Sequence, residues 1–238
     1  MKVWKRSLPV WLLTLVMLLT ACGTPSQPDQ PDGTETWREA YEETGAYLQA
    51  QTAPTVGSIG GEWAVIGLSR ARLLSDETAQ SYEQTVEDYV KQAGSVRLHH
   101  AKSTENSRTI LGLTAAGYNA ANVAGVDLTA GLTDMAYLRA QGTNGPIWAL
   151  IALDCHGYDI PQCADGEEQT TREGLVAEIL SYQCSDGGWA LMGDESDVDM
   201  TAMALTSLAP YQEETDVKAA VDTALTYLSD AQQADGGF

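Results

Sequence analysis

Basic residues are scarce in this sequence of 238 residues. Lysine and arginine together number 13, against 33 aspartate and glutamate residues, and the formal net charge is −20. Binding to a phosphate backbone depends on clustered lysine and arginine side chains. The balance of charge therefore excludes nucleic acid as a partner.

Aromatic residues are scarce as well. The chain has one phenylalanine and six tryptophans, and two of these, Trp4 and Trp11, lie in the N-terminal segment. A pocket that stabilises carbocations needs an aromatic lining, because the faces of the rings attract positive charge. The composition therefore argues against such a pocket.

The N-terminus has the pattern of an export signal. Three basic residues precede an apolar run over residues 8–19, which is too short to span a bilayer comfortably. The run ends in Leu19-Thr20-Ala21-Cys22, which resembles the cleavage box of bacterial lipoproteins. The resemblance implies that residues 1–21 are removed, that the Cys22 thiol is acylated, and that the protein is extracytoplasmic and anchored to the bacterial cell membrane. An ordinary signal peptide with a chance cysteine is the alternative.

The composition changes after this segment. Residues 22–36 are rich in proline and polar residues and predict a tether. Residues 37–238 are long enough for one domain with a sizeable core. Cys155 and Cys163 flank a short loop there, and either a disulfide or free thiols fit an extracytoplasmic protein. Their spacing from His156 matches no usual zinc site.

Two short motifs alternate along the chain. In the first motif, a tyrosine or isoleucine is followed by leucine or valine and then by polar residues or alanine. It recurs at 47–51, 89–93, 137–141, 179–183 and 227–231. The second, nearly all apolar and rich in small residues, recurs at 63–68, 108–113, 148–153 and 203–208.

Pairs of helices explain both motifs. Residues 82–92 are amphipathic with an apolar face at helical spacing, which predicts an outer helix. The second motif is apolar on most sides and predicts an inner helix. Strand signals are scarce, so we expect an all-α fold. Stacked helix pairs form either an open superhelix or a closed α/α toroid.

Several motifs resemble those of one superfamily. Residues 183–189, QCSDGGW, resemble the QW box of squalene cyclases and prenyltransferases; residues 232–238 repeat the box with phenylalanine in the tryptophan position, and 141–148 are a degenerate copy. Residues 197–203, DVDMTAM, are similar to the aspartate motif of terpene cyclases and to inner-helix starts in transcobalamin and intrinsic factor. In overall build, the chain is similar to bacterial surface lipoproteins with prenyltransferase-like repeats. The resemblance implies an α/α toroid over 37–238, incomplete at its C-terminal end, and isoprenoid or cobalamin as ligand classes.

The resemblance to terpene cyclases implies a catalytic role for Asp199. In those enzymes the corresponding aspartate protonates the substrate, and to do so near neutral pH it must be buried beside a carboxylate such as Asp197. Met200 occupies the place of a further aspartate, so the motif is incomplete. A cyclase-type enzyme that uses Asp199 is therefore the alternative function.

The acidic residues around this motif have two further interpretations. Asp194, Glu195, Asp197 and Asp199 suit a solvated loop and a helix cap. Oxygen ligands on an acidic loop also suit calcium, which Asp194, Asp197 and Asp199 would bind, although the spacing is not that of an EF-hand.

Polar and aromatic residues stand at the starts of successive inner helices. In a toroid these starts lie on one rim, and their side chains predict a ligand-binding site there. The residues are Glu62, Trp63, Glu105, Asn106, Arg108, Asn144, Trp148, Trp189 and Asp199. The sequence thus predicts a surface lipoprotein that binds a small molecule or a partner at this rim, with caps and turn-formers as the structural alternative for each residue.

The anchor gives a first prediction. If Cys22 carries the lipid, the protein sediments with membranes and incorporates labelled palmitate, whereas Cys22→Ser abolishes the label and releases the protein or blocks its maturation. Fractionation with metabolic labelling tests this expectation. Palmitate labelling that persists in Cys22→Ser would contradict it.

Overall fold

The structure is a computed structural model that describes residues 33–50, 54–57 and 59–238. The predicted signal peptide, Cys22 and the tether up to residue 32 lie outside these residues. The chain divides into two compact units, Met1–Ala46 and Tyr47–Phe238. Helix α2 (Gly33–Gln49) begins inside the predicted tether, so residues 33–36 are helical. The larger compact unit begins at residue 47, ten residues after the predicted domain start at 37.

The unit Tyr47–Phe238 is helical, and none of its described residues belongs to a β-strand. The all-α prediction is confirmed. Its helices are α3 (Ala64–Arg70), α4 (Asp76–Ala93), α5 (Thr104–Ala115), α6 (Met135–Arg139), α7 (Asn144–Asp154), α8 (Arg172–Ser181), α9 (Val198–Leu208) and α10 (Thr215–Ala231). Shorter turns are the π-helical η1 (Ile59–Trp63) and the 3-10 helices η2 (Leu128–Leu132) and η3 (Ala209–Tyr211).

The helices lie where the two motifs predict them. The apolar motif falls mainly in α3, α5, α7 and α9, and the other motif falls at the C-terminal ends of α2, α4, α6, α8 and α10. Side-chain caps mark several starts: Ser75 accepts a bond from Thr78 N–H at α4, and Thr171 accepts one from Gly174 N–H at α8. These bonds satisfy amide groups that lack an intrahelical partner.

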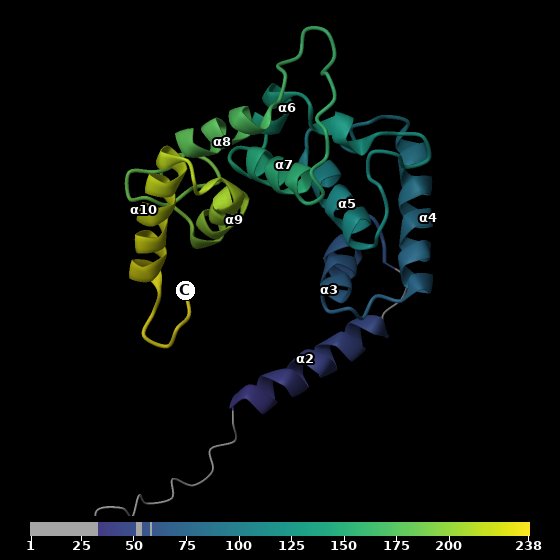
Figure 1. The fold of residues 1–238 in the computed structure, drawn as a ribbon, viewed down its shortest axis with the longest axis horizontal. Coiled ribbons are helices and arrows are strands. Elements are labelled where there is room, and N and C mark those ends of the chain that lie inside the picture. The colour runs from purple at the N-terminus through teal and green to yellow at the C-terminus, as the bar shows by residue number, and fades with distance from the viewer. Residues whose placement is uncertain (1–32, 51–53, 58) are drawn as a thin grey trace, which may run out of the picture. The chain divides into compact units, whose positions relative to one another are not determined.

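Helices α3, α5, α7 and α9 form one series in which each helix packs against the next. Helix α4 packs on α5, α6 and α8 pack on α7, and α10 packs on α8 and α9. Figure 1 shows this arrangement within Tyr47–Phe238, with α3, α5, α7 and α9 on the inside of α4, α6, α8 and α10. Fully buried residues such as Ile110, Leu150 and Leu208 fill the contacts along the series.

The turn over residues 183–189 is a compact hydrogen-bonded unit. Gln183 Nε2 donates to Gly187 O at 2.8 Å, and Gly187 has a φ of 93°, which favours glycine. The indole of Trp189 is fully buried and donates to Ile179 O at 2.7 Å. The turn therefore ties the end of α8 to the start of α9.

The second copy of this box forms the same local bond. Gln232 Nε2 donates to Gly236 O at 3.0 Å, but Phe238 is exposed where Trp189 is buried. In the degenerate copy, Gln141 Oε1 instead accepts a bond from Thr104 N–H at 2.9 Å. The ring is thus fully buried in the first copy, exposed in the second, and partly buried against the core in the degenerate copy, where it is Trp148.

Each of the cysteines that the structure describes, Cys155, Cys163 and Cys184, carries a free thiol. Of the two alternatives left open by the sequence, the free thiols are therefore the ones present. The loop between Cys155 and Cys163 is held by other bonds: the Arg172 side chain donates to Asp154 Oδ1 at 2.7 Å and to Tyr158 O at 2.9 Å.

The burial of Trp189 gives a stability prediction. We expect Trp189→Ala to lower the free energy of unfolding by about 3–5 kcal/mol, because it opens a cavity and leaves Ile179 O without its indole donor. Urea unfolding followed by circular dichroism measures the loss. Trp37→Ala, at an exposed site in α2, is the control and should change the value by less than about 0.5 kcal/mol. Equal stability of the Trp189→Ala variant and the parent would show that the turn is not part of the core.

Candidate functional site

The starts of the inner helices meet at one end of the series. Arg108, in α5, forms an ion pair with Glu62, in η1 just before α3. The first residue of α5, Thr104, is bonded to Gln141, just before α7. The predicted convergence of these helix starts is therefore present for α3, α5 and α7.

Three charged side chains form the centre of this region. Arg108 Nε lies 3.3 Å from Glu62 Oε2, and Arg108 Nη2 lies 2.6 Å from Glu105 Oε2. The Glu62 side chain has no exposed surface, and its Oε1 accepts a bond of 2.8 Å from Gly57 N–H. A buried carboxylate is costly unless it is paired and hydrogen-bonded, and both conditions hold here.

Tyr82, from the outer helix α4, lies beneath these charges. Its side chain is fully buried, and its hydroxyl has no hydrogen-bond partner among the residues that the structure describes. The ring packs against α5 where Gly112 has no side chain, since a Cβ there would overlap the Tyr82 hydroxyl and lie 3.3 Å from Glu62 Cβ. Burial raises the pKa of Tyr82 well above its usual range; Glu62 raises it further and Arg108 opposes the rise.

Two tryptophans of the inner series pack against each other. Trp63 follows Glu62 in the chain, and its ring centroid lies 5.3 Å from that of Trp148, in α7, with the planes at 65°. This edge-to-face arrangement is favourable for aromatic pairs. Trp63 is 39% exposed, so the pair presents aromatic surface to solvent. We call Glu62, Trp63, Glu105, Arg108 and Trp148 the Glu62 site.

Other residues predicted to bind a ligand have structural contacts. Asn106 is fully buried and holds the neighbouring loops, since its amide donates to Val96 O and Leu128 O and accepts from Leu98 N–H. Trp189 has no exposed surface and serves the turn before α9. Neither side chain can contact a ligand at the surface. Asn144 is the partly exposed first residue of α7, and no contact places it in the Glu62 site.

The acidic residues before α9 lie at the surface. Asp197 caps the helix through a bond of 2.8 Å from Met200 N–H, and Asp199 is exposed in its first turn. This position does not supply the burial that a proton donor needs near neutral pH. Within the described part of the chain, no group of three or more metal-ligating residues lies together, and Asp194, Asp197 and Asp199 form no such group.

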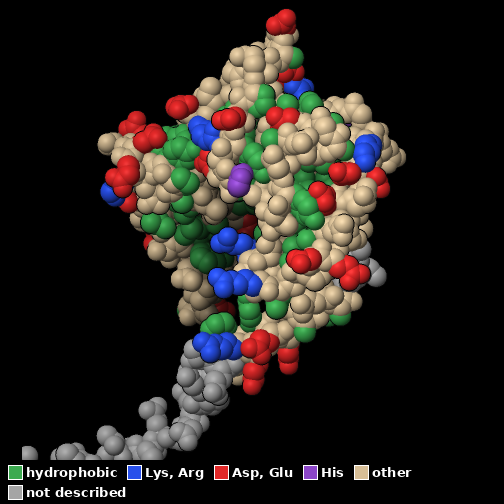
Figure 2. All heavy atoms as spheres, turned by 45° about the vertical axis from the view of Figure 1, so that its right-hand side comes forward, with side chains coloured by type: hydrophobic (Ala, Val, Ile, Leu, Met, Phe, Trp, Pro, Cys, Tyr) green, Lys and Arg blue, Asp and Glu red, His purple; other side chains and the backbone are tan. Residues whose placement is uncertain are grey.

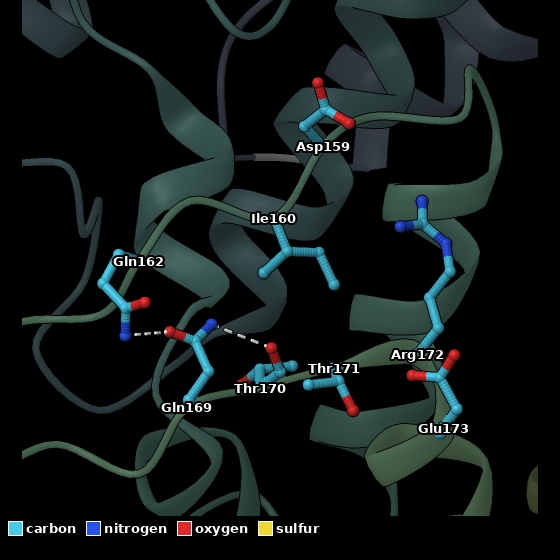
Figure 3. Close-up of a pocket in the computed structure, with 8 residues that line it drawn as sticks. All are labelled: Asp159, Ile160, Gln162, Gln169, Thr170, Thr171, Arg172 and Glu173. Carbon is cyan, nitrogen blue, oxygen red and sulfur yellow. Dashed lines mark hydrogen bonds between the residues drawn. The ribbon is translucent and has the colours of Figure 1, made fainter.

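A pocket of about 360 Å³, not predicted from the sequence, lies over the loop that leads into α8. Figure 3 shows Gln162 and Gln169 hydrogen-bonded to each other at one side and Arg172 directed away from them. Gln169 also bonds to Pro161 O, and Arg172 bonds to Asp154, so these side chains mainly hold their own loop. A groove of about 550 Å³ between α8 and α10 is lined largely by small and polar residues such as Ala219.

Acidic side chains are spread over the surface, as expected from the acidic composition. Figure 2 shows acidic side chains scattered over the face drawn, with basic side chains near a hollow that hydrophobic ones border. Among the helices formed by the described residues, none is long and apolar enough to cross a membrane.

Comparisons of the chain with protein-family models, with curated proteins and with solved structures found no match. The residues and their contacts therefore have to carry the functional argument.

The contact between Tyr82 and Gly112 can be tested by a double-mutant cycle. Gly112→Ala should lower the free energy of unfolding by about 1–3 kcal/mol, because the new methyl group overlaps the Tyr82 hydroxyl. Adding Tyr82→Phe removes that hydroxyl and should recover part of the loss. Urea unfolding of the two single variants and the double variant gives the coupling.

Gly67→Ala is the matched control. It lies in α3, and a Cβ there meets no atom within 4 Å. Alanine should therefore stabilise this helix by about 0.5–1 kcal/mol. If Gly112→Ala behaved like Gly67→Ala, the close contact between Tyr82 and α5 would not exist.

Proposed function

We propose that this chain is an extracytoplasmic lipoprotein that captures a small molecule at the Glu62 site. In this proposal the helix pairs belong to an α/α toroid, whose inner helix starts form the rim of the binding site. Acylation of Cys22 holds the protein on the outer side of the cell membrane. The tether then places the site in the extracytoplasmic space.

The observation that carries the proposal is a partly exposed aromatic pair, one member of which, Trp63, directly follows the buried Glu62 in the chain. Trp63 and Trp148 present ring surface to solvent beside Glu62, whose side chain is fully buried. Aromatic side chains supply much of the binding energy at recognition sites, and a few placed polar groups supply the orientation. The Glu62 site has both kinds of group within one cluster.

Burial of Glu62 is not favoured by stability alone. Replacing a buried ion pair with apolar residues of similar size is often neutral or stabilising. The pair of Glu62 with Arg108 therefore supports a role in binding, as does the partly exposed Glu105 on the same guanidinium.

Capture is favoured over a cyclase-type reaction. The only acid that the resemblance assigns to such a reaction is Asp199, which is exposed at the start of α9. Its neighbour Asp197 is used as a helix cap. Cobalamin and isoprenoids remain candidate ligands by resemblance, and the proposal does not depend on either.

Fluorine NMR of the full chain labelled with 5-fluorotryptophan tests the proposal. The probes are neutral, cationic and anionic fragments, with cobalamin and a linear diterpene diphosphate as separate additions. We expect the chemical shifts of Trp63 and Trp148 to change in parallel and to saturate as the concentration of at least one probe rises, because the two rings are in contact.

The other tryptophans serve as internal controls. Trp37 is exposed in α2 and Trp189 is buried in the core, so neither should follow the binding curve. Single Trp→Phe variants assign the resonances. The proposed site would be overturned if only the Trp37 resonance shifted. It would also be overturned if no probe shifted the resonances of Trp63 and Trp148.

A further inference from the structure

The hydrogen-bonding groups at the Glu62 site point to the chemical class of its ligand, an inference that rests on the proposed function. We propose that the site takes a neutral saccharide, with its hydroxyl groups at Arg108 and Glu105 and an apolar sugar face against Trp63 and Trp148. Three properties of the site support this assignment: its donors and acceptors, its charge, and its aromatic surface.

Donors and acceptors lie side by side in this site. The Tyr82 hydroxyl is buried without a partner among the described residues, and Arg108 Nε, although within ion-pair distance of Glu62, makes no hydrogen bond there. The carboxylates of Glu62 and Glu105 are acceptors only. A hydroxyl group both donates and accepts, so a single ligand oxygen, or a water molecule that it holds, can satisfy groups of both kinds.

The unpartnered Tyr82 hydroxyl is an observation separate from the three charged side chains. It comes from α4, whereas the charges come from η1 and α5, and it lies against the Glu62 side chain. An unsatisfied buried polar group costs about 1–3 kcal/mol. A polar atom within hydrogen-bonding distance of the Tyr82 hydroxyl would offset the cost of burying it. In the proposal, the bound ligand positions such an atom.

The charge of the cluster favours a neutral ligand. Two carboxylates surround one guanidinium, so an anion would meet repulsion from Glu62 and Glu105. An ammonium group brings only donors, which would leave Arg108 Nε, itself a donor, without an acceptor. A neutral ligand with several hydroxyl groups avoids both penalties.

The tryptophan pair supplies the apolar part of the site. The planes of Trp63 and Trp148 are inclined at 65°, so the rings form two walls at a steep angle. A sugar ring has an apolar face of C–H groups and a rim of hydroxyl groups. Such a molecule can place its face on an indole while its rim reaches the adjacent charged groups.

Isothermal titration calorimetry of the full chain tests the assignment. The probes are the neutral trisaccharides of glucose and of N-acetylglucosamine in several linkages, choline as a cation, and galacturonate as an anion. We expect at least one neutral saccharide to bind, with an affinity that changes less than about twofold between about 0.05 and 0.5 M salt, because screening acts on charged ligands.

Substitutions in the Glu62 site test whether the saccharide binds there. Glu105→Gln removes a charged acceptor at a partly exposed position and should weaken saccharide binding by about 10- to 100-fold. Trp63→Ala should weaken it at least tenfold, whereas Trp37→Ala, at another exposed tryptophan, should leave it unchanged. Circular dichroism checks that each variant is folded.

The outcomes separate the two proposals. Binding of choline or galacturonate that depends on Trp63, without any saccharide binding, would overturn the ligand class and leave the proposed function standing. Saccharide binding that Trp63→Ala does not weaken would overturn the assignment to this site. If no probe bound and no fragment shifted the fluorine signals of Trp63 and Trp148, both proposals would fail.

Discussion

Burial of helix α7 is the constraint on which the rest of the larger unit depends. Ile147, Leu150 and Leu153 have no exposed surface, and the intervening Ala149 and Ala152 are also buried. Each fully buried large apolar side chain contributes about 1.5–3 kcal/mol, whereas an isolated helix of this length is marginal in water. Helix α7 therefore exists only between its neighbours α5, α6, α8 and α9, and these contacts place the starts of the inner helices at one end.

That arrangement explains why polar groups gather there. Amide groups in the first turn of a helix lack intrahelical partners and carry partial positive charge, so carboxylates are stabilised nearby. Glu105 lies in the first turn of α5, and Glu62 lies in η1, the π-helical turn that leads into α3. Arg108 is one turn further along α5 and lies between the two carboxylates. Packing of apolar helices thus brings Glu62 to a pair of charged residues, Glu105 and Arg108, that lie far from it in the sequence.

The sequence predicts the local features well. Helical periodicity and cap residues are local, so the positions of α5, α7 and α9 follow from them, whereas the convergence of Glu62 and Arg108 follows from the stacking of repeated helix pairs. The role of Asn106 could not be predicted, because its partners Val96, in a loop, and Leu128, at the start of η2, reach it only through tertiary packing. The position of Trp189 close to the start of an inner helix predicts a place at the rim, but the ring lies in the core.

Tyr82 shows a different limit of sequence reasoning. At helical spacing with Val86 and Tyr89 it is interpreted as a core residue, which is correct for its ring. The hydroxyl has a separate role that only the contact with α5 reveals, where Gly112 makes room for it beside Glu62. Phenylalanine would fill the same space without an unsatisfied buried donor. Packing therefore accounts for the ring but not for the hydroxyl, for which the proposed ligand would supply a hydrogen-bond partner.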